Sequence, residues 1–158
     1  MYQLECFEEG QDVNYWYATT DRDLDAIEIY KRHYSARHYK NGRANLRTQG
    51  FVGPGEKMIL ITARADALFV WLYSKLGHRN GQKGVYCPIF RNEGRVKSSE
   101  LIREAVELAK ARWPGKRFFT YVNAEKIKST NPGCCFLKAG WRKCGKTKGG
   151  LHIFEANP

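Results

Sequence analysis

The stretch from Val85 to Leu108 reads VYCPIFRNEGRVKSSELIREAVEL, and its hydrophobic pattern changes in the middle. Its first six residues, Val85–Phe90, are apolar or aromatic and predict a strand. From Ser98 onward the apolar residues recur every three to four positions, which predicts a helix with Ser98 or Ser99 as its N-cap. The polar loop between these elements therefore connects the end of a strand to the N-terminus of a helix.

Pro88 interrupts the predicted strand, because proline has no N–H group to donate to a central ladder. We therefore expect a bulge, a splay or an edge at this position. The loop that follows carries Arg95, Lys97 and two serines close to the helix N-terminus, where backbone N–H groups are unpaired. Such donors favour a pyrophosphate-binding loop, and the open alternative is a simple connection.

Upstream of this stretch, two apolar runs predict an antiparallel hairpin of central strands, Glu56–Thr62 and Ala67–Tyr73. A further strand is expected over Asn14–Thr20, and a helix after it with Thr20 or Asp21 as its cap. Helical spacing predicts the buried stripe of that helix: Leu24, Ile27, Tyr30 and Tyr34. Glycines and basic residues from Tyr39 to Gly55 predict a long basic loop.

Downstream, the helix that begins near Ser98 is expected to end near Trp113, before Pro114-Gly115. A strand over Arg117–Val122 and a short helix over Cys134–Ala139 are expected next. Two further runs predict a closing hairpin, Trp141–Cys144 with Leu151–Phe154. The element order β-α-loop-β-β-β-α-β-α-β-β predicts one α+β domain over residues 1–158, with a mixed, mostly antiparallel sheet flanked by helices.

The composition excludes several classes of protein. Hydrophobic residues make up 42% of the 158 residues and aromatic residues 13%, too many for a disordered basic tail. No apolar run approaches the ~20 residues that span a bilayer, and residues 1–10 do not resemble a signal peptide. The five cysteines follow no disulfide or metal-binding spacing. We expect a cytoplasmic protein with reduced thiols, no metal site and no membrane partner.

The formal net charge of +11 is unevenly distributed along the chain. The first 30 residues hold eight of the 16 acidic residues and one of the 27 Lys and Arg residues, whereas Lys31–Gly55 and Lys126–Phe154 contain no acid. This asymmetry favours a polyanionic partner, DNA in our interpretation, over a solvated basic surface. The expected nucleic-acid contacts are Arg37, His38, Tyr39, Lys40, Arg43, Arg47, Lys143, Lys146 and Lys148.

The order of the elements resembles that of the GNAT acyltransferase superfamily over nearly the whole chain. The most specific local match is Asn131–Trp141, NPGCCFLKAGW, in which Phe136 stands four residues before Gly140-Trp141, as an aromatic residue does in that family. The resemblance implies a GNAT-like fold and an acyltransferase activity. It also implies a small-molecule acyl donor, acetyl-CoA or another acyl-CoA.

The resemblance further implies where the donor binds. Val85–Phe90 would hold the pantetheine arm through its backbone and splay from Arg117–Val122, with the acyl group in the gap. The implied cofactor contacts are Cys87, Ile89, Phe90, Arg91, Gly94, Arg95, Lys97, Ser98, Ser99, Asn131 and Phe136. Val96 and Ser98 stand where the family's loop has small residues, and their side chains hinder close backbone approach to a phosphate. Coenzyme A use is therefore left open.

The candidate catalytic residues are Glu93, Asn92 and Tyr121. Glu93 is the one acid between Asp66 and Glu100, so it is a candidate general base; the equal alternative is a surface acid paired with Arg91 or Arg95. Asn92 could bind an acyl carbonyl or phosphate, or serve in a turn. Phe136 replaces the tyrosine that often protonates the departing thiolate in the family. Tyr121, Cys135 or a water would then be the acid.

A narrower resemblance is to Mom-type DNA modification proteins of bacteriophages, in RNEG, SSELIREA and TYVNAEKIKSTNPGCCFLKAGW. It implies transfer of a small acyl-type group onto an amine of a DNA base, as an anti-restriction device in the host cytoplasm. Both acid-free stretches would then flank the acceptor side of one cleft. Two alternatives stay open: an acetyltransferase of a small amine or protein lysine, and a catalytically inactive GNAT-like nucleic-acid binder. A homodimer is also left open.

Overall fold

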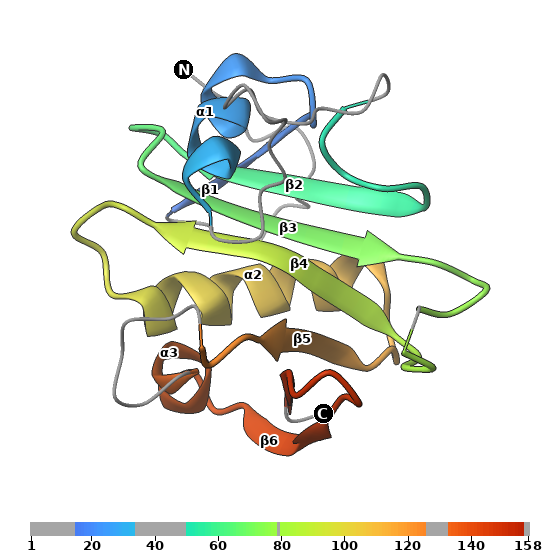
Figure 1. Cartoon of the computed structure of the whole chain (residues 1–158). Coiled ribbons are helices and arrows are strands. Elements are labelled where there is room, and N and C mark those ends of the chain that lie inside the picture. Colours follow the sequence, from blue (N-terminus) through green and yellow to red (C-terminus); the bar gives the residue numbers. More distant parts are fainter. Residues whose placement is uncertain (1–14, 34–49, 79, 126–132, 157–158) are drawn as a thin grey trace, which may run out of the picture.

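The computed structural model describes residues 15–33, 50–78, 80–125 and 133–156. These residues form one seven-stranded sheet with the strand order β1-β2-β3-β4-β5-β7-β6, together with three helices (Figure 1). The strands are β1 (Trp16–Thr19), β2 (Glu56–Thr62), β3 (Ala67–Tyr73), β4 (Val85–Asn92), β5 (Phe118–Val122), β6 (Arg142–Lys146) and β7 (His152–Glu155). The helices are α1 (Leu24–Arg32), α2 (Ser98–Arg112) and α3 (Cys134–Lys138).

Strand β4 and strand β5 are the parallel pair of this sheet, and the other neighbouring strands are antiparallel. Parallel neighbours need a crossover connection, and helix α2 provides it here. The β4–α2–β5 unit therefore forms the centre of the fold. Its loops are the places where a ligand can approach both strand ends and a helix end.

The two long helices cover opposite faces of the sheet. Side chains alternate between the faces along a strand. In β3, Leu68 and Val70 belong to the buried cluster with α1, whereas Phe69 and Trp71 belong to the cluster with α2. The sheet is thus buried on both sides at its centre, which explains why β2 and β3 read as continuous apolar runs.

Two indole groups attach helix α2 to the sheet. Trp16 Nε1 donates to the Leu101 carbonyl at 2.8 Å, and Trp71 Nε1 donates to the Ala105 carbonyl at 3.0 Å. Both hydrogen bonds are buried, where each contributes about 1 kcal/mol and an unpaired indole N–H would cost more. They fix the position of α2 against β1 and β3.

The element order expected from the sequence is confirmed, but both predicted helix caps are wrong. The N-cap of α1 is Asp23, whose carboxylate accepts from the N–H groups of Asp25 and Ala26. Asp21, the expected cap, is buried and forms an ion pair with Lys57. The N-cap residue of α2 is Lys97, without a side-chain cap, and the predicted Ser98 is already in the helix.

The predicted apolar stripe of α1 also needs correction. Leu24 is 78% exposed, Ile27 is half-buried, and Tyr34 lies outside the described residues. The buried residues of this helix are Ala26, Ile29 and Tyr30. Because the helix begins at Leu24, that residue lies in its first turn, away from β3 and β4. No helix in the described part of the chain is long and apolar enough to cross a bilayer.

Candidate functional site

The site implied by the sequence lies where β4 and β5 separate. The two strands pair only over Val85–Cys87 and Phe118–Thr120. Beyond these residues β4 continues to Asn92 beside β3, and β5 continues to Val122 beside β7. Figure 1 shows the two strands diverging toward their C-terminal ends, with α2 behind them. The expected splay is confirmed.

Pro88 and a bulge explain the separation. The register of β4 against β3 moves from Tyr86 opposite Leu72 to Ile89 opposite Val70, so one extra residue of β4 is accommodated between them. Pro88 lies in this bulge and cannot donate to β5. Thr120 Oγ1 donates to the Cys87 carbonyl at 2.7 Å, which satisfies that buried carbonyl beside the separation.

Asn92 organises the loop between β4 and α2. Its Nδ2 donates to the Val96 carbonyl at 2.7 Å and to Ser98 Oγ at 3.0 Å, and its Oδ1 accepts from the Gly94 N–H at 3.0 Å. A Cβ atom on Gly94 would fall 2.4 Å from the carboxylate of Asp66. Of the two interpretations of Asn92, the geometry favours the turn residue over a ligand contact.

Glu93 lies between two guanidinium groups. Arg32 of α1 binds it in a bidentate manner at 2.6 and 2.7 Å, and Arg91 Nε binds it at 2.7 Å. The hydrogen bond from Arg32, and then that from Arg91, lowers the pKa of Glu93 to about 2. A carboxylate stabilised in this way is a weak base at neutral pH, so its setting is that of a structural ion pair. Arg91 is one of the two partners that the sequence suggested, while Arg32 was not anticipated.

A groove of about 640 Å³ lies at the N-terminus of α2. Lys97, Ser98 and Ser99, all expected to contact the cofactor, line this groove together with Arg103 and Lys138. Arg103 Nη2 donates to the Lys138 carbonyl at 2.6 Å and thereby joins α2 to α3. Glu100, Cys134 and Cys135 complete the lining. The lining thus combines three cations, two hydroxyl groups and a helix N-terminus with only one carboxylate. Such a set of groups suits a phosphate ligand.

The other expected cofactor contacts among the described residues do not line this groove. Arg91, Gly94 and Arg95 are absent from its lining, and Asn131 lies outside the described residues. The side chains of Cys87, Ile89 and Phe136 are buried in the core. At Cys87 and Ile89, a ligand in the strand separation could therefore contact only backbone groups. Burial raises the pKa of the Cys87 thiol well above its ordinary value, which makes it inert.

Phe136 belongs to an aromatic cluster on the α2 side of the separation. Its ring centre lies 6.0 Å from that of Phe90, 4.8 Å from that of Trp141 and 6.5 Å from that of Phe154. A tyrosine hydroxyl at position 136 would need a polar partner within this apolar cluster. The phenylalanine is therefore explained by packing.

Tyr121 follows Thr120, the last residue of β5 that pairs with β4. Its ring packs against Tyr86 and Phe119, with centroid distances of 5.1 and 5.6 Å. Its hydroxyl is shielded from solvent and forms no hydrogen bond of good geometry with the described residues. Burial raises the pKa of this hydroxyl, and the neighbouring Asn80 and Arg117 lower it less strongly. A buried hydroxyl beside the strand separation keeps Tyr121 as a candidate proton donor.

His33 is a second buried titratable group near the separation. It lies at the end of α1, and a hydrogen bond to the backbone of Phe90 connects it to β4 beyond the bulge. Burial, and then the charge of Arg91, lowers the pKa of His33 to about 4 against the opposing effect of this hydrogen bond. His33 is therefore a neutral imidazole at pH 7. Its neighbours Lys31 and Arg32 are exposed, so the local sequence gives no sign that His33 is buried.

The expected nucleic-acid contacts divide into two groups. Lys143, Lys146 and Lys148 are exposed on β6 and the turn after it, at one edge of the sheet. The contacts expected within residues 34–49 lie outside the described residues: Arg37, His38, Tyr39, Lys40, Arg43 and Arg47. The end of α1 packs on β3 and β4, several strands from β6. Whether both basic stretches face one opening remains a prediction.

Comparison with known proteins relates this geometry to an enzyme fold. No family model matches the sequence, and no curated protein matches it. The structure is similar to the crystal structure of an acyl-CoA N-acyltransferase from Pseudomonas aeruginosa, with a TM-score of 0.56 and 12% sequence identity. The similarity covers 90% of this chain and 98% of that one. The chain thus has a GNAT-like acyl-CoA N-acyltransferase fold, and this fold prediction is confirmed.

Proposed function

We propose that the chain is an N-acyltransferase that joins an acyl group from a coenzyme A thioester to an amine. The observation that carries this proposal is the separation of β4 from β5 beyond Cys87 and Thr120, next to a basic groove at the N-terminus of the connecting helix. Similarity to the fold of an acyl-CoA N-acyltransferase supports it.

The residues of the α2 groove fit the pyrophosphate of the donor. Lys97, Arg103 and Lys138 supply positive charge, and Ser98 and Ser99 add hydroxyl donors beside the helix N-terminus. Because Gly94 packs on Asp66, side chains rather than glycine backbone would hold the phosphates in this protein. Bound there, the coenzyme would supply an acyl group activated as a thioester.

The transfer forms a carbon–nitrogen bond, breaks the carbon–sulfur bond and moves one proton from the amine to the departing sulfur. Beyond Cys87, β4 has β3 as its one partner among the described strands, so its other edge is unoccupied by a strand. We assign the contact with the acyl carbonyl to backbone N–H groups of this edge, in the manner of an oxyanion hole.

We assign proton donation to Tyr121, whose hydroxyl can protonate the departing thiolate. The lowered pKa values of Glu93 and His33, about 2 and about 4, make both side chains weak bases at pH 7, so we assign the base role to neither. Glu93 instead positions Arg32 and Arg91 and thereby ties α1 to the end of β4. Asn92 positions the loop.

We further propose that the acceptor amine belongs to a base of DNA. The net charge of +11 and the two acid-free basic stretches support a polyanionic acceptor more than a free small amine or a protein lysine. A catalytically inactive nucleic-acid binder is a second candidate, because Glu93 is held in ion pairs and Phe136 has no proton to donate.

The test combines binding with product analysis. Calorimetric titration with acetyl-CoA should show saturable binding, and incubation with acetyl-CoA and plasmid DNA should release thiol. Nucleoside mass spectrometry should then find a base heavier by the acyl group. Thiol release with a lysine peptide or a polyamine but not with DNA would contradict the DNA acceptor. Absence of acetyl-CoA binding would contradict the transferase and leave the inactive binder.

A further inference from the structure

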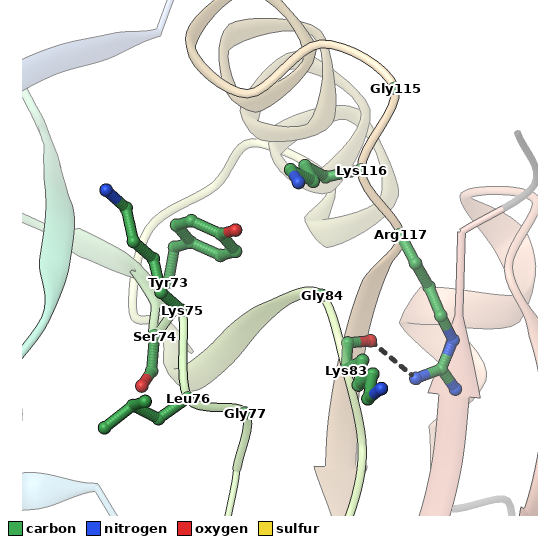
Figure 2. A pocket seen from close by; sticks show the side chains of 10 residues that line it. All are labelled: Tyr73, Ser74, Lys75, Leu76, Gly77, Lys83, Gly84, Gly115, Lys116 and Arg117. Carbon is green, nitrogen blue, oxygen red and sulfur yellow. Dashed lines mark hydrogen bonds between the residues drawn. The ribbon is translucent and has the colours of Figure 1, made fainter.

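A second basic groove lies at the opposite end of the β4–α2–β5 unit (Figure 2). It has a volume of about 630 Å³ and is formed by the β3–β4 connection and by the turn between α2 and β5. Helix α2 has 15 residues and rises ~1.5 Å per residue, so the two grooves lie at opposite ends of a helix roughly 22 Å long. The residues that matter here are Tyr73, Lys75, Leu76, Lys83, Lys116 and Arg117.

The groove carries three uncompensated positive charges. None of its described lining residues is acidic. Lys75, Lys83 and Lys116 are exposed, and none of them forms an ion pair with an acid in the described part of the chain. Arg117 differs, because its Nε binds Glu155 at 2.6 Å. Glu155 thus neutralises Arg117, and the three lysines remain available to an anion.

Hydrogen bonds hold the walls of this groove in place. Arg117 Nη1 donates to Gln82 Oε1 at 3.0 Å and to the Lys83 carbonyl at 3.2 Å, and the Val85 N–H donates to the Arg117 carbonyl at 2.7 Å. A Cβ atom on Gly84 would fall 2.3 Å from the Arg117 carbonyl oxygen, so only glycine permits this approach. A preformed surface loses less conformational entropy when it binds a ligand.

The lysines are arranged for an extended anion rather than for one compact phosphate. They come from two separate loops, and the groove lining has no helix N-terminus and a single serine, Ser74, beside Lys75. Lys116 Nζ lies 5.4 Å from the centre of the Tyr73 ring, and Leu76 at the rim is 99% exposed. Lysines are point charges that contact phosphates without fixed geometry. The half-buried ring of Tyr73 and the exposed side chain of Leu76 suit sugars or bases.

We propose that this second groove binds the phosphodiester backbone of nucleic acid. The protein would thus bind its DNA substrate at a distance from the groove at the N-terminus of α2, which we assign to the acyl donor. The inference rests on the proposed function only for the identity of the polyanion as DNA. Binding at this groove requires no acyl transfer.

The test uses fluorescence anisotropy of the full chain with a labelled 20-base-pair duplex, over a series of salt concentrations and without acetyl-CoA. The variant Lys75→Gln/Lys83→Gln removes two groove charges. The control Lys57→Gln/Lys110→Gln removes two lysines outside both acid-free stretches, which form ion pairs with Asp21 and Glu107. Circular dichroism and thermal melting verify that both variants are folded.

For the groove variant, the slope of log K against log salt concentration should become shallower by about 2, which is about 1 for each phosphate contact removed. This change should be the same for all DNA sequences. The control should change the slope by less than about 0.5. Equal losses in both variants, or no DNA binding by the wild type, would overturn the proposal. So would equally tight binding of polyglutamate with the same loss in the groove variant, because the partner would then be an acidic protein.

A separate titration of the wild type with acetyl-CoA distinguishes the two proposals. A chain that binds acetyl-CoA but shows no groove-dependent DNA affinity contradicts this inference alone. A chain that binds DNA through the groove but does not bind acetyl-CoA contradicts the transferase alone.

Discussion

The two ends of the β4–α2–β5 unit are both basic, but they are basic for different reasons. At the N-terminus of α2, Lys97, Ser98 and Ser99 cooperate with a helix dipole that itself attracts anions. At the other end, the helix dipole is negative and Lys116 follows the last turn. There the attraction for an anion comes from lysine side chains alone.

This difference predicts two kinds of binding. A compact pyrophosphate gains from the convergent donors of the α2 N-terminus, and those hydrogen bonds are partly protected from salt. An extended polyanion gains from several separate lysines, and such binding weakens steeply as salt rises. One unit can therefore hold a small donor at one end and a large acceptor at the other without competition between them.

The largest expected effect concerns the rigid wall of the second groove. Gly84→Ala places a Cβ atom against the Arg117 carbonyl at a backbone φ of +123°, so we expect a loss of about 3 kcal/mol in the free energy of unfolding. Gly115→Ala is the matched control, because its φ is +74° but its Cβ would meet no atom within 4 Å; we expect about 1 kcal/mol. Urea unfolding measures both, and equal losses would show that the wall is not tightly packed.

A large effect on rate is expected at the open end of the strand pair. Tyr121→Phe should slow acyl transfer about 100-fold while leaving the affinity for acetyl-CoA unchanged, because it removes a proton donor and keeps the ring packing. Thiol release measured under saturating donor gives kcat. A rate within two-fold of the wild type would exclude Tyr121 as the general acid. Tyr17→Phe, on the edge strand β1 and outside both grooves, is the control.

A smaller effect is expected on donor affinity. Arg103→Ala removes a cation of the α2 groove and the hydrogen bond to the Lys138 carbonyl. We expect acetyl-CoA to bind about 10-fold more weakly, since a charge-assisted contact contributes about 1.4 kcal/mol. Arg112→Ala changes the same residue type at the other end of α2 and should leave the affinity unaltered. If calorimetry shows an equal loss of acetyl-CoA affinity in both variants, the donor does not bind specifically at the N-terminus of α2.

The smallest effect concerns the ion pair that ties α1 to β4. The pKa of Glu93 is lowered to about 2 in the folded chain from an ordinary value of 4.5, so its contribution is complete above pH 4.5 and disappears as the pH falls toward 2. Glu93→Gln should therefore cost about 1 kcal/mol at pH 7, allowing for solvent screening, and nothing near pH 2. Thermal melting across this pH range measures the difference; a difference that persists at pH 2 would contradict the ion-pair assignment.

Local patterns in the sequence predicted most of the fold. The β2–β3 hairpin has the predicted bounds, because both strands are continuous apolar runs with polar turns around them. The break at Pro88 was predictable because proline removes a specific hydrogen bond. The cap of α1 was not, since Thr20, Asp21 and Asp23 all suit a helix start. The choice of Asp23 depends on a turn, in which its N–H donates to the Thr20 carbonyl at 3.2 Å.

The site was less predictable than the fold because its contacts are distant in the sequence. Lys97, Ser98 and Ser99 adjoin one another, so a local pattern could place them together in one groove. Arg32 and Glu93 are 61 residues apart, and no local pattern relates them. The second groove unites Lys75 and Lys83 with Lys116 only because β4 and β5 begin side by side. In a chain with 27 Lys and Arg residues, three lysines that are separated in the sequence do not indicate a common binding site.

A crystal structure of the complex with acetyl-CoA would show which groove binds the donor. We predict pyrophosphate density beside Lys97, Ser98 and Ser99, with the pantetheine arm between β4 and β5 beyond Cys87 and Thr120. Density for the coenzyme in the groove of Lys75, Lys83 and Lys116, or an unliganded α2 groove at saturating acetyl-CoA, would contradict this prediction.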